Sequence, residues 1–363
     1  MRAPFLSSPL RSALARLALL LALLLGGCAG ATQTAAPTVA PTAVPVPTRA
    51  GPTPIPTPAA GQFANPVISQ DFPDPDALKV GDTYYAYATN TGGTNIPLAS
   101  SDDLVAWQPL GEALPALPAW AEPGYTWAPE ASTLPSGGVV LYFTARDAQS
   151  QRQCIGAATA TAPEGPFAPA GDQPLICQRE QGGSIDPAAF TDTDGTRYLL
   201  WKNDGNCCGQ DTWLYIQRVA PDGLTLEGEP TQLIKQDQGW EGRLVEAPTL
   251  WKHEDRYYLF YSANSYAGAD YAVGYAVADQ VLGPYRKSPQ PLLQTSTKGS
   301  VVIGPGGQDV QIGPDGRTWM LYHSWDLSLS YRTLSIDPLE WQGETPVVRG
   351  PSRVPQSLPE DSQ

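Results

Sequence analysis

Four acidic residues beside prolines recur at nearly equal intervals along the chain. They stand in the strings FPDP, WAPE, SIDP and VEAP, 56, 56 and 60 residues apart: Asp74, Glu130, Asp186 and Glu246. Carboxylates that converge repel one another, so at least one of them takes a raised pKa. Titratable groups whose pKa values are pushed apart are what general acid–base catalysis requires. We therefore predict that part of this set transfers protons.

The same residue type can also serve structure, because a carboxylate accepts hydrogen bonds from the backbone amides of a neighbouring segment. We expect this capping role for Glu130. We expect chemistry from Asp74, Asp186 and Glu246, because a core gains nothing from three converging charges. Either role requires elements that bring residues 56 to 60 positions apart to one place.

A unit repeated five times supplies such elements. Each unit contains an aromatic-rich strand: YYAYAT from Tyr84, VVLYFTA from Val139, RYLLWK from Arg197, YYLFYS from Tyr257 and TWMLYHS from Thr318. Three of these strands follow hairpin turns, Gly81-Asp82, Asp194-Gly195 and Asp315-Gly316. A third and a fourth strand follow, and apolar residues recur in the fourth strand at intervals of 60, 59, 59 and 56: Trp107, Phe167, Leu226, Tyr285 and Trp341.

This repeat predicts an all-β fold, a five-bladed β-propeller with four antiparallel strands per blade. A β-sandwich is the alternative, but sandwiches do not repeat at this period. The first strand of each propeller blade lines the central axis, so the four acids should meet at one end of a central channel. In the fifth unit, Gly306-Gly307-Gln308 stands where an acid is expected.

Substrate-binding residues are predicted from the same topology. First and second strands run antiparallel, so the loops after the second strands border the end of the axis where the acids lie. From these loops we select Lys202, Asn264 and Trp325. Trp127 joins them because its place in the repeat is next to the axis.

The acidic strings resemble glycoside hydrolase family 43, and the resemblance covers roughly residues 65–345. It rests on four strings that occur in order at blade spacing: NPVISQDFPDPDALKVGDTYYAYAT, TWAPE, IDPAAFTDTDGTRYLLWK and EAPTLWKHEDRYYLFYSAN. The family fold is a five-bladed propeller, and the family reaction is inverting hydrolysis of arabinosides, xylosides or related linkages. The resemblance therefore implies this fold and this reaction here.

Carried over onto matching positions, the resemblance implies that Asp74 is the general base and Glu246 the general acid. Asp186 matches the aspartate that orients the acid and modulates its pKa. Physical logic agrees, because inversion needs one carboxyl to protonate the leaving oxygen and another, ~6.5–9.5 Å away, to activate a water. A negative Asp186 near Glu246 would keep the acid protonated to higher pH.

Many family members carry a histidine in the blade-five string, and some place calcium near the axis. Here the string is Gly304-Pro305-Gly306-Gly307-Gln308. We therefore expect no required metal and no cofactor. His323, at the end of a second strand, fits a packed strand residue and a site residue equally well.

The N-terminal segment is typical of an export signal. Arginines precede Leu17 to Leu25, an apolar run too short to span a bilayer, for which roughly 20 residues are needed. The string Leu25-Gly26-Gly27-Cys28 resembles a bacterial lipobox. We expect residues 1–27 to be a lipoprotein signal peptide and Cys28 to carry lipid; an ordinary cleaved signal is the alternative.

The remaining boundaries follow composition. Residues 28–60 read as a Pro/Thr-rich linker, 61–350 as the catalytic propeller, and 351–363 as a flexible tail. The export signal permits disulfides, and Cys154 with Cys177 is the local pairing. Cys207 and Cys208 would then form a vicinal bridge or pair elsewhere.

Charge narrows the partners. A formal net charge of −14 repels nucleic acid and anionic membrane surfaces, whereas a neutral glycan remains a suitable partner. The membrane is reached only through the lipid anchor, on the extracellular side, and a monomer is expected.

Together these observations predict an exported inverting glycosidase acting on arabinose- or xylose-containing plant polysaccharides or oligosaccharides, with α-L-arabinofuranosidase favoured over β-xylosidase. One alternative is a non-catalytic glycan-binding propeller, against which the presence of all three acids argues. The other is a retaining enzyme of related fold that acts on sucrose or fructan. The anomer of the first-formed product separates that alternative from inversion.

Overall fold

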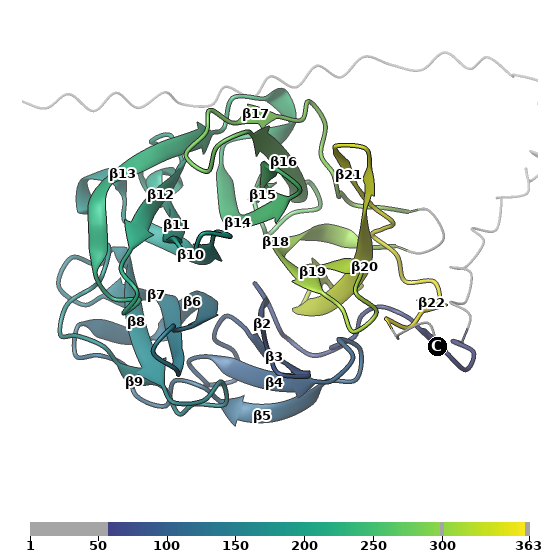
Figure 1. Cartoon of the computed structure of the whole chain (residues 1–363), viewed down its shortest axis with the longest axis horizontal. Coiled ribbons are helices and arrows are strands. Elements are labelled where there is room, and N and C mark those ends of the chain that lie inside the picture. The colour runs from purple at the N-terminus through teal and green to yellow at the C-terminus, as the bar shows by residue number, and fades with distance from the viewer. Residues whose placement is uncertain (1–56, 298–300, 360–363) are drawn as a thin grey trace, which may run out of the picture. The chain divides into compact units, whose positions relative to one another are not determined.

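The computed structural model describes residues 57–297 and 301–359. Five four-stranded antiparallel sheets are arranged around a common axis as the blades of a β-propeller (Figure 1). The fold predicted from the repeat is therefore confirmed. The predicted signal peptide, Cys28 and most of the predicted linker lie outside the described residues. No helix within the described residues is long and apolar enough to cross a bilayer.

Each blade is built from strands that are consecutive in the sequence. Blade one consists of β2 (Asp76–Val80), β3 (Thr83–Tyr87), β4 (Pro97–Ser101) and β5 (Gln108–Glu112). Blade two consists of β6 (Ala121–Thr133), β7 (Val139–Asp147), β8 (Gln153–Ala160) and β9 (Ala168–Pro169). Blade three consists of β10 (Ser184–Thr191), β11 (Arg197–Asn203), β12 (Trp213–Val219) and β13 (Leu226–Lys235). Blades four and five consist of β14 (Val245–His253), β15 (Arg256–Ala263), β16 (Ala272–Ala278) and β17 (Arg286–Lys287), then β18 (Ile303–Ile312), β19 (Thr318–Trp325), β20 (Arg332–Gln342) and β21 (Thr345–Val348).

The second strands are buried along nearly their whole length, β7 and β11 most completely. A blade is covered by a neighbour on each side, so both faces of its middle strands meet apolar surface. This explains why the second strands read as continuous aromatic runs rather than alternating apolar and polar residues. The core accordingly consists of separate apolar clusters between adjacent blades.

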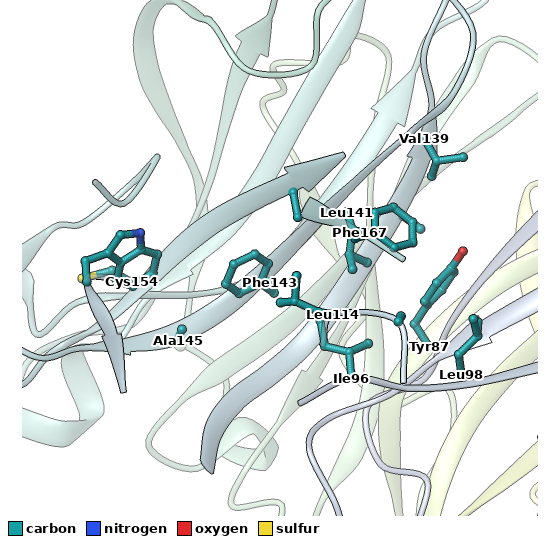
Figure 2. Close-up of a cluster of buried hydrophobic side chains, with 14 residues drawn as sticks. Tyr87, Ile96, Leu98, Leu114, Val139, Leu141, Phe143, Ala145, Cys154 and Phe167 are labelled. Carbon is teal, nitrogen blue, oxygen red and sulfur yellow. The ribbon is translucent and has the colours of Figure 1, made fainter. Parts of the chain in front are cut away.

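Figure 2 shows the cluster between blades one and two. Tyr87 and Leu98 of blade one pack with Leu141, Phe143 and Phe167 of blade two, and all five side chains are at most 3% exposed. The Tyr87 and Phe167 rings meet edge to face, with centroids 6.1 Å apart. Aromatic pairs in this geometry contribute about 0.5–1.5 kcal/mol beyond their buried area. Contacts of this kind hold the innermost strands in place around the axis.

The two ends of the propeller segment meet beside blade five. β1 (Gln62–Phe63) pairs with β22 (Gln356–Ser357) in an antiparallel ladder. Asn65 links the same region to β20, because its side chain donates to the carbonyl of Ile336 at 2.7 Å and accepts from the Ile336 amide at 2.9 Å. Gln356 and Ser357, which lie in the segment predicted to be a flexible tail, are thus paired with β1.

The predicted fourth-strand positions need one correction. Trp107, Phe167 and Tyr285 directly precede β5, β9 and β17, and Leu226 opens β13. Trp341 instead lies in β20, the third strand of blade five. This third strand runs on to Gln342 before the chain turns, and Trp341 stacks on His253 of blade four with centroids 3.8 Å apart.

Two disulfides lie on the second and third blades. Cys154, in β8, is bonded to Cys177, and the adjacent Cys207 and Cys208 are bonded to each other. The second bond lies in the 3₁₀ turn η2 (Gly205–Cys208), in the loop that leaves the second strand of blade three. That loop borders the cavity described below.

Candidate active site

One residue on the innermost strand of each blade, or just before it in blade one, adopts a left-handed backbone conformation. The five φ angles are 50°, 40°, 54°, 49° and 55°, at Asp74, Ala128, Asp186, Ala247 and Gly307 in that order. A left-handed φ is unfavourable for residues other than glycine and persists where the surrounding structure fixes it. These residues occupy equivalent positions, which we call the bend positions.

Hydrogen bonds between blades hold four of the bends. The bend residue's amide donates to a side chain on the second strand of the preceding blade, or just after it in the case of Thr89. The four contacts are Ala128 to Thr89 Oγ1 at 2.8 Å, Asp186 to Thr144 Oγ1 at 3.1 Å, Gly307 to Ser262 Oγ at 2.9 Å, and Asp74 to His323 Nδ1 at 3.1 Å. Because β-strands alternate sides, fixing the bend also fixes which side chains point into the axis. We call these contacts the bend hydrogen bonds.

The bends correct the predicted register of the acids. Asp74 and Asp186 are bend residues, but the bend of blade two is Ala128, so Glu130 lies two positions further along its strand. Glu246 lies one position before the bend of blade four. Equal spacing in the sequence concealed these offsets, because the loops between the blades differ in length.

The residues two positions after the bends form a second set of acids deeper along the axis, which we call the acid ring: Asp76, Glu130 and Asp309. Each one accepts a backbone amide of the next blade: Ala131 N to Asp76 Oδ2 at 2.8 Å, Ala189 N to Glu130 Oε1 at 2.9 Å, and Ala77 N to Asp309 Oδ2 at 3.1 Å. The capping contact predicted for Glu130 is therefore present. Blade five does carry an axial acid, Asp309, which the sequence analysis missed.

A cavity of about 350 Å³ opens at the end of the axis where the bends lie. Its walls include the predicted catalytic acids Asp74, Asp186 and Glu246, and also Trp127 and Lys202. Residues from all five blades or their loops contribute to it, with Thr89, Asn206, Cys207, Tyr266, Tyr271 and Arg332 among the others. Three acids from three blades thus face one space, as the convergence of first strands predicts.

Asp74 is held as a carboxylate. Its Oδ1 lies 2.9 Å from an Arg332 guanidinium nitrogen, and its Oδ2 accepts the Thr89 hydroxyl at 2.7 Å. Burial raises the pKa of Asp74, but the charge of Arg332 together with the contacts of His323 and Thr89 outweighs it, so the pKa lies well below its usual range. An acid of this kind stays ionised and can accept a proton from water.

Asp186 has the opposite tendency. Burial and the nearby charge of Glu246 raise the pKa of Asp186 to about 7, although Lys202 and the amide of Ala247 act against this rise. Because Glu246 is one cause of the shift, the retained proton belongs to the carboxyl pair rather than to one residue. The pair is therefore able to deliver a proton near neutral pH.

Two of the four predicted substrate-binding residues lie elsewhere. The Asn264 side chain donates to the carbonyls of Trp240 at 2.6 Å and Asp270 at 3.0 Å, so it ties loops together. The Trp325 indole donates to the carbonyl of Tyr266 at 2.7 Å. Neither residue is among those that line the cavity, so their contact with sugar stays a prediction that the cavity lining does not support. A loop position gives no information on side-chain direction, which depends on partners in distant loops.

Three residues near Asp74 were missed or left open by the sequence. Arg332 lies in β20, the third strand of blade five. It was not predicted because the predicted substrate-binding residues came mainly from loops after second strands. Tyr271 stacks on His323 with parallel rings whose centroids are 5.6 Å apart. His323 is buried, and burial followed by the charge of Arg332 lowers the pKa of His323. A neutral imidazole whose Nδ1 accepts the Asp74 amide supports the site from behind.

The donor set does not suit a metal ion. Within residues 57–297 and 301–359, no three His, Cys, Asp or Glu side chains are grouped so as to hold one. Next to the axis, Gly307 packs so closely that a Cβ placed on it would lie 2.6 Å from His323 Nδ1.

An ionised carboxylate and a carboxyl with a raised pKa that face one cavity are the kind of pair that glycoside hydrolysis uses. The family model for "Glycosyl hydrolases family 43" matches residues 63–346. This chain belongs to glycoside hydrolase family 43, and the resemblance seen in its motifs is confirmed. It is accordingly an O-glycosidase.

Known relatives agree with this assignment. A solved structure titled "Crystal structure of a thermostable family-43 glycoside hydrolase" is 33% identical, with a TM-score of 0.74, and the match covers 83% of this chain and 100% of that one. A putative beta-xylosidase of Xylanibacter ruminicola is 26% identical over 79% of this chain, which spans only half of that protein's length. An extracellular exo-alpha-(1->5)-L-arabinofuranosidase of Cellvibrio japonicus is 26% identical over 76% of this chain and 85% of its own length.

Proposed function

We propose that this chain is an inverting exo-glycosidase that removes terminal α-L-arabinofuranosyl units from plant polysaccharides or oligosaccharides. The observation that carries the proposal is the opposite protonation of two acidic groups that line one cavity. The charge of Arg332 holds the pKa of Asp74 well below its usual range, whereas burial and the charge of Glu246 raise the pKa of Asp186 to about 7. Hydrolysis with inversion needs this combination of a base and an acid.

In the proposed reaction, one acid accepts a proton from water and another donates a proton to the leaving oxygen. Asp74 takes a proton from a water molecule as the water oxygen bonds to the anomeric carbon. Glu246 gives its proton to the glycosidic oxygen as the bond between this oxygen and the anomeric carbon breaks. After these steps Asp74 carries a proton and the Asp186–Glu246 pair has lost one, and proton exchange with solvent returns both groups to their starting states. Water enters opposite the leaving group, so the anomeric configuration inverts.

Two observations support the substrate and the exo mode. The arabinofuranosidase of Cellvibrio japonicus matches along most of its length. The cavity, about 350 Å³, lies at the small end of the range of roughly 300–1,000 Å³ that ligand pockets occupy. A pocket of this small size fits one terminal sugar better than the interior of a long chain.

The experiment is a substrate screen of the purified protein. It covers nitrophenyl α-L-arabinofuranoside, β-D-xyloside and β-D-galactofuranoside, together with arabino- and xylo-oligosaccharides. An Asp74→Asn variant prepared in parallel controls for contaminating enzymes. We expect release of arabinose from chain ends by the wild type and none by the variant. Release of xylose alone would contradict the proposed substrate. Cleavage only inside chains would contradict the proposed exo mode.

We also propose that the mature protein is exported and held at the cell surface by lipid on Cys28. The string that ends in Cys28 motivates the anchor, and the extracellular relative of Cellvibrio japonicus supports export. Metabolic labelling with a radioactive fatty acid should mark the wild type and leave a Cys28→Ala variant unlabelled. Equal labelling of both would contradict the anchor.

A further inference from the structure

The bend hydrogen bonds have an exception in blade three. Thr144, Ser262 and His323 pair across their blades with the residue just before the bend, and Thr89 bonds to Pro73 in the same way. Lys202 occupies this position in blade three, where it pairs with Ile185. The other four residues accept the amide of the next bend. An ammonium group has no acceptor, so Lys202 cannot do so.

The structure resolves this exception by an exchange of partners. The amide of Ala247, the bend residue of blade four, donates instead to Asp186 Oδ2 at 2.9 Å. The ammonium of Lys202 makes no bend hydrogen bond. It lies 3.0 Å from Glu246 Oε2 and 3.9 Å from Asp204 Oδ1. The presence of lysine at this position thus gives each member of the acid pair a partner. Asp186 accepts the amide of Ala247, and Glu246 contacts the ammonium of Lys202.

Burial makes the contact with Lys202 consequential. The Lys202 side chain is 0% exposed and that of Glu246 is 11% exposed, so water screens their charges weakly. The titratable and charged groups that face the pair come from several elements: Lys202 and Asp204 in blade three, Tyr271 in the loop of blade four, Asp74 in blade one, and His323 and Arg332 in blade five. Of these, Lys202 forms the ion pair with Glu246.

We propose that Lys202 is a positioning residue that holds Glu246 toward the cavity and sets the pH above which the acid pair loses its proton. Without the ammonium, four carboxyls, those of Asp74, Asp186, Asp204 and Glu246, would share the cavity with Arg332, which is bound to Asp74. The pair would then hold its proton more tightly and release it to the leaving oxygen less readily. This role differs from the sugar contact predicted from the sequence, because the contact that the structure gives the Lys202 ammonium at hydrogen-bond distance is with Glu246.

The proposal rests on the proposed function, in which the pair donates a proton, and is tested on the full-length enzyme. We measure kcat/KM and kcat against pH for the wild type, Lys202→Met and Lys202→Arg, using the best substrate from the screen. In Lys202→Met we expect kcat to fall, KM to stay within about threefold, and the alkaline limb to move up by about 1–3 pH units, the shift that loss of one opposite charge produces. Lys202→Arg keeps the charge and should keep the limb close to its wild-type position.

Ser262→Ala is the matched control, because it removes the acceptor at the same position of blade four without changing charge. We expect its alkaline limb to match the wild type. An unmoved limb in Lys202→Met, or a large rise in KM with kcat unchanged, would overturn the proposal. If Lys202→Met does not fold, Lys202→Gln replaces it under the same criteria. Wild-type inactivity on every glycoside would instead contradict the proposed function. Failure of the proposed function is therefore distinguishable from failure of the role of Lys202, which requires an active wild type with an unmoved limb in the variant.

Discussion

The propeller axis carries two sets of three carboxyls, and they differ in their partners rather than in their residue types. Asp74, Asp186 and Glu246 face the cavity, where cationic side chains pair with two of them. The acid ring, formed by Asp76, Glu130 and Asp309, lies two residues further along the same kind of strand and accepts backbone amides. The open cavity, and cationic partners on Asp74 and Glu246, therefore mark the acids suited to chemistry, although Asp186 also accepts a backbone amide of the next blade, that of Ala247.

The two sets also hold their protons for different reasons. Burial and the charges of Asp76 and Asp309 raise the pKa of Glu130 well above its usual value. Burial likewise raises the pKa of Asp309 to about 6. In the acid ring this proton relieves repulsion inside the channel. In the cavity, the protonated pair Asp186–Glu246 faces an ionised Asp74. One side can therefore donate a proton while the other accepts one.

The largest expected effect separates Asp74 from Asp76, two residues along the chain. Asp74→Ala should lower kcat/KM by ~10²–10⁴-fold on every substrate, the usual contribution of a general base. Asp76→Asn keeps an acceptor for the Ala131 amide and should retain kcat/KM within a few-fold. Steady-state kinetics on one nitrophenyl glycoside and one oligosaccharide measure both. Comparable losses in the two variants would break the distinction between the sets.

A smaller effect concerns pH. Since the pair that includes Asp186 holds its proton to about pH 7, kcat/KM should fall about tenfold per pH unit above that value. Asp74 has a lowered pKa and stays ionised in mild acid, so activity should change little between pH 5 and pH 6 through this residue. A pH–rate profile of the wild type checks both limbs. An alkaline limb that begins several units above pH 7 would contradict the assignment of the acid.

The two tryptophans on the cavity side offer a matched pair. Trp127 lines the cavity, whereas the Trp325 indole bonds to the carbonyl of Tyr266 in a loop. Trp127→Ala should raise KM about tenfold, equivalent to about 1.4 kcal/mol of lost contact. Trp325→Ala should raise KM less than about threefold. The reverse order in initial-rate measurements would restore the sugar contact that the sequence predicted for Trp325.

The smallest effect is on stability and concerns Glu130→Gln. Because the pKa of Glu130 is raised in the folded protein, the folded chain binds more protons than the unfolded chain above pH 4.5, and the free energy of unfolding falls as pH rises. Glutamine keeps an acceptor for the Ala189 amide and removes this dependence. We expect the Tm of the variant relative to the wild type to increase from pH 5 to pH 8, by a few degrees, with activity retained. If calorimetry showed that the Tm difference between the variant and the wild type stays constant or falls with pH, a raised pKa at Glu130 would be contradicted.

The sequence predicted most of the fold because the repeat combines two local signals, aromatic second strands and turn residues, five times over. It predicted Asp74, Asp186 and Glu246 because their strings stand at blade spacing. It misplaced Glu130 relative to Asp74, since a shift of two residues leaves the same face pointing inward and no pattern reports it. Arg332 and the bend hydrogen bonds escaped prediction because they join strands of different blades, whose contacts depend on the closed ring.

The most direct test of the account is the dependence of the two acids on the leaving group. A departing alcohol of a natural oligosaccharide needs a proton, whereas a nitrophenolate needs little help. Glu246→Ala should therefore lose far more activity on the oligosaccharide than on the nitrophenyl glycoside, and Asp74→Ala should lose both alike. The measurement is the ratio of kcat/KM on the two substrates for each variant. If Asp74→Ala were the variant rescued by nitrophenolate, the roles of acid and base assigned here would be contradicted.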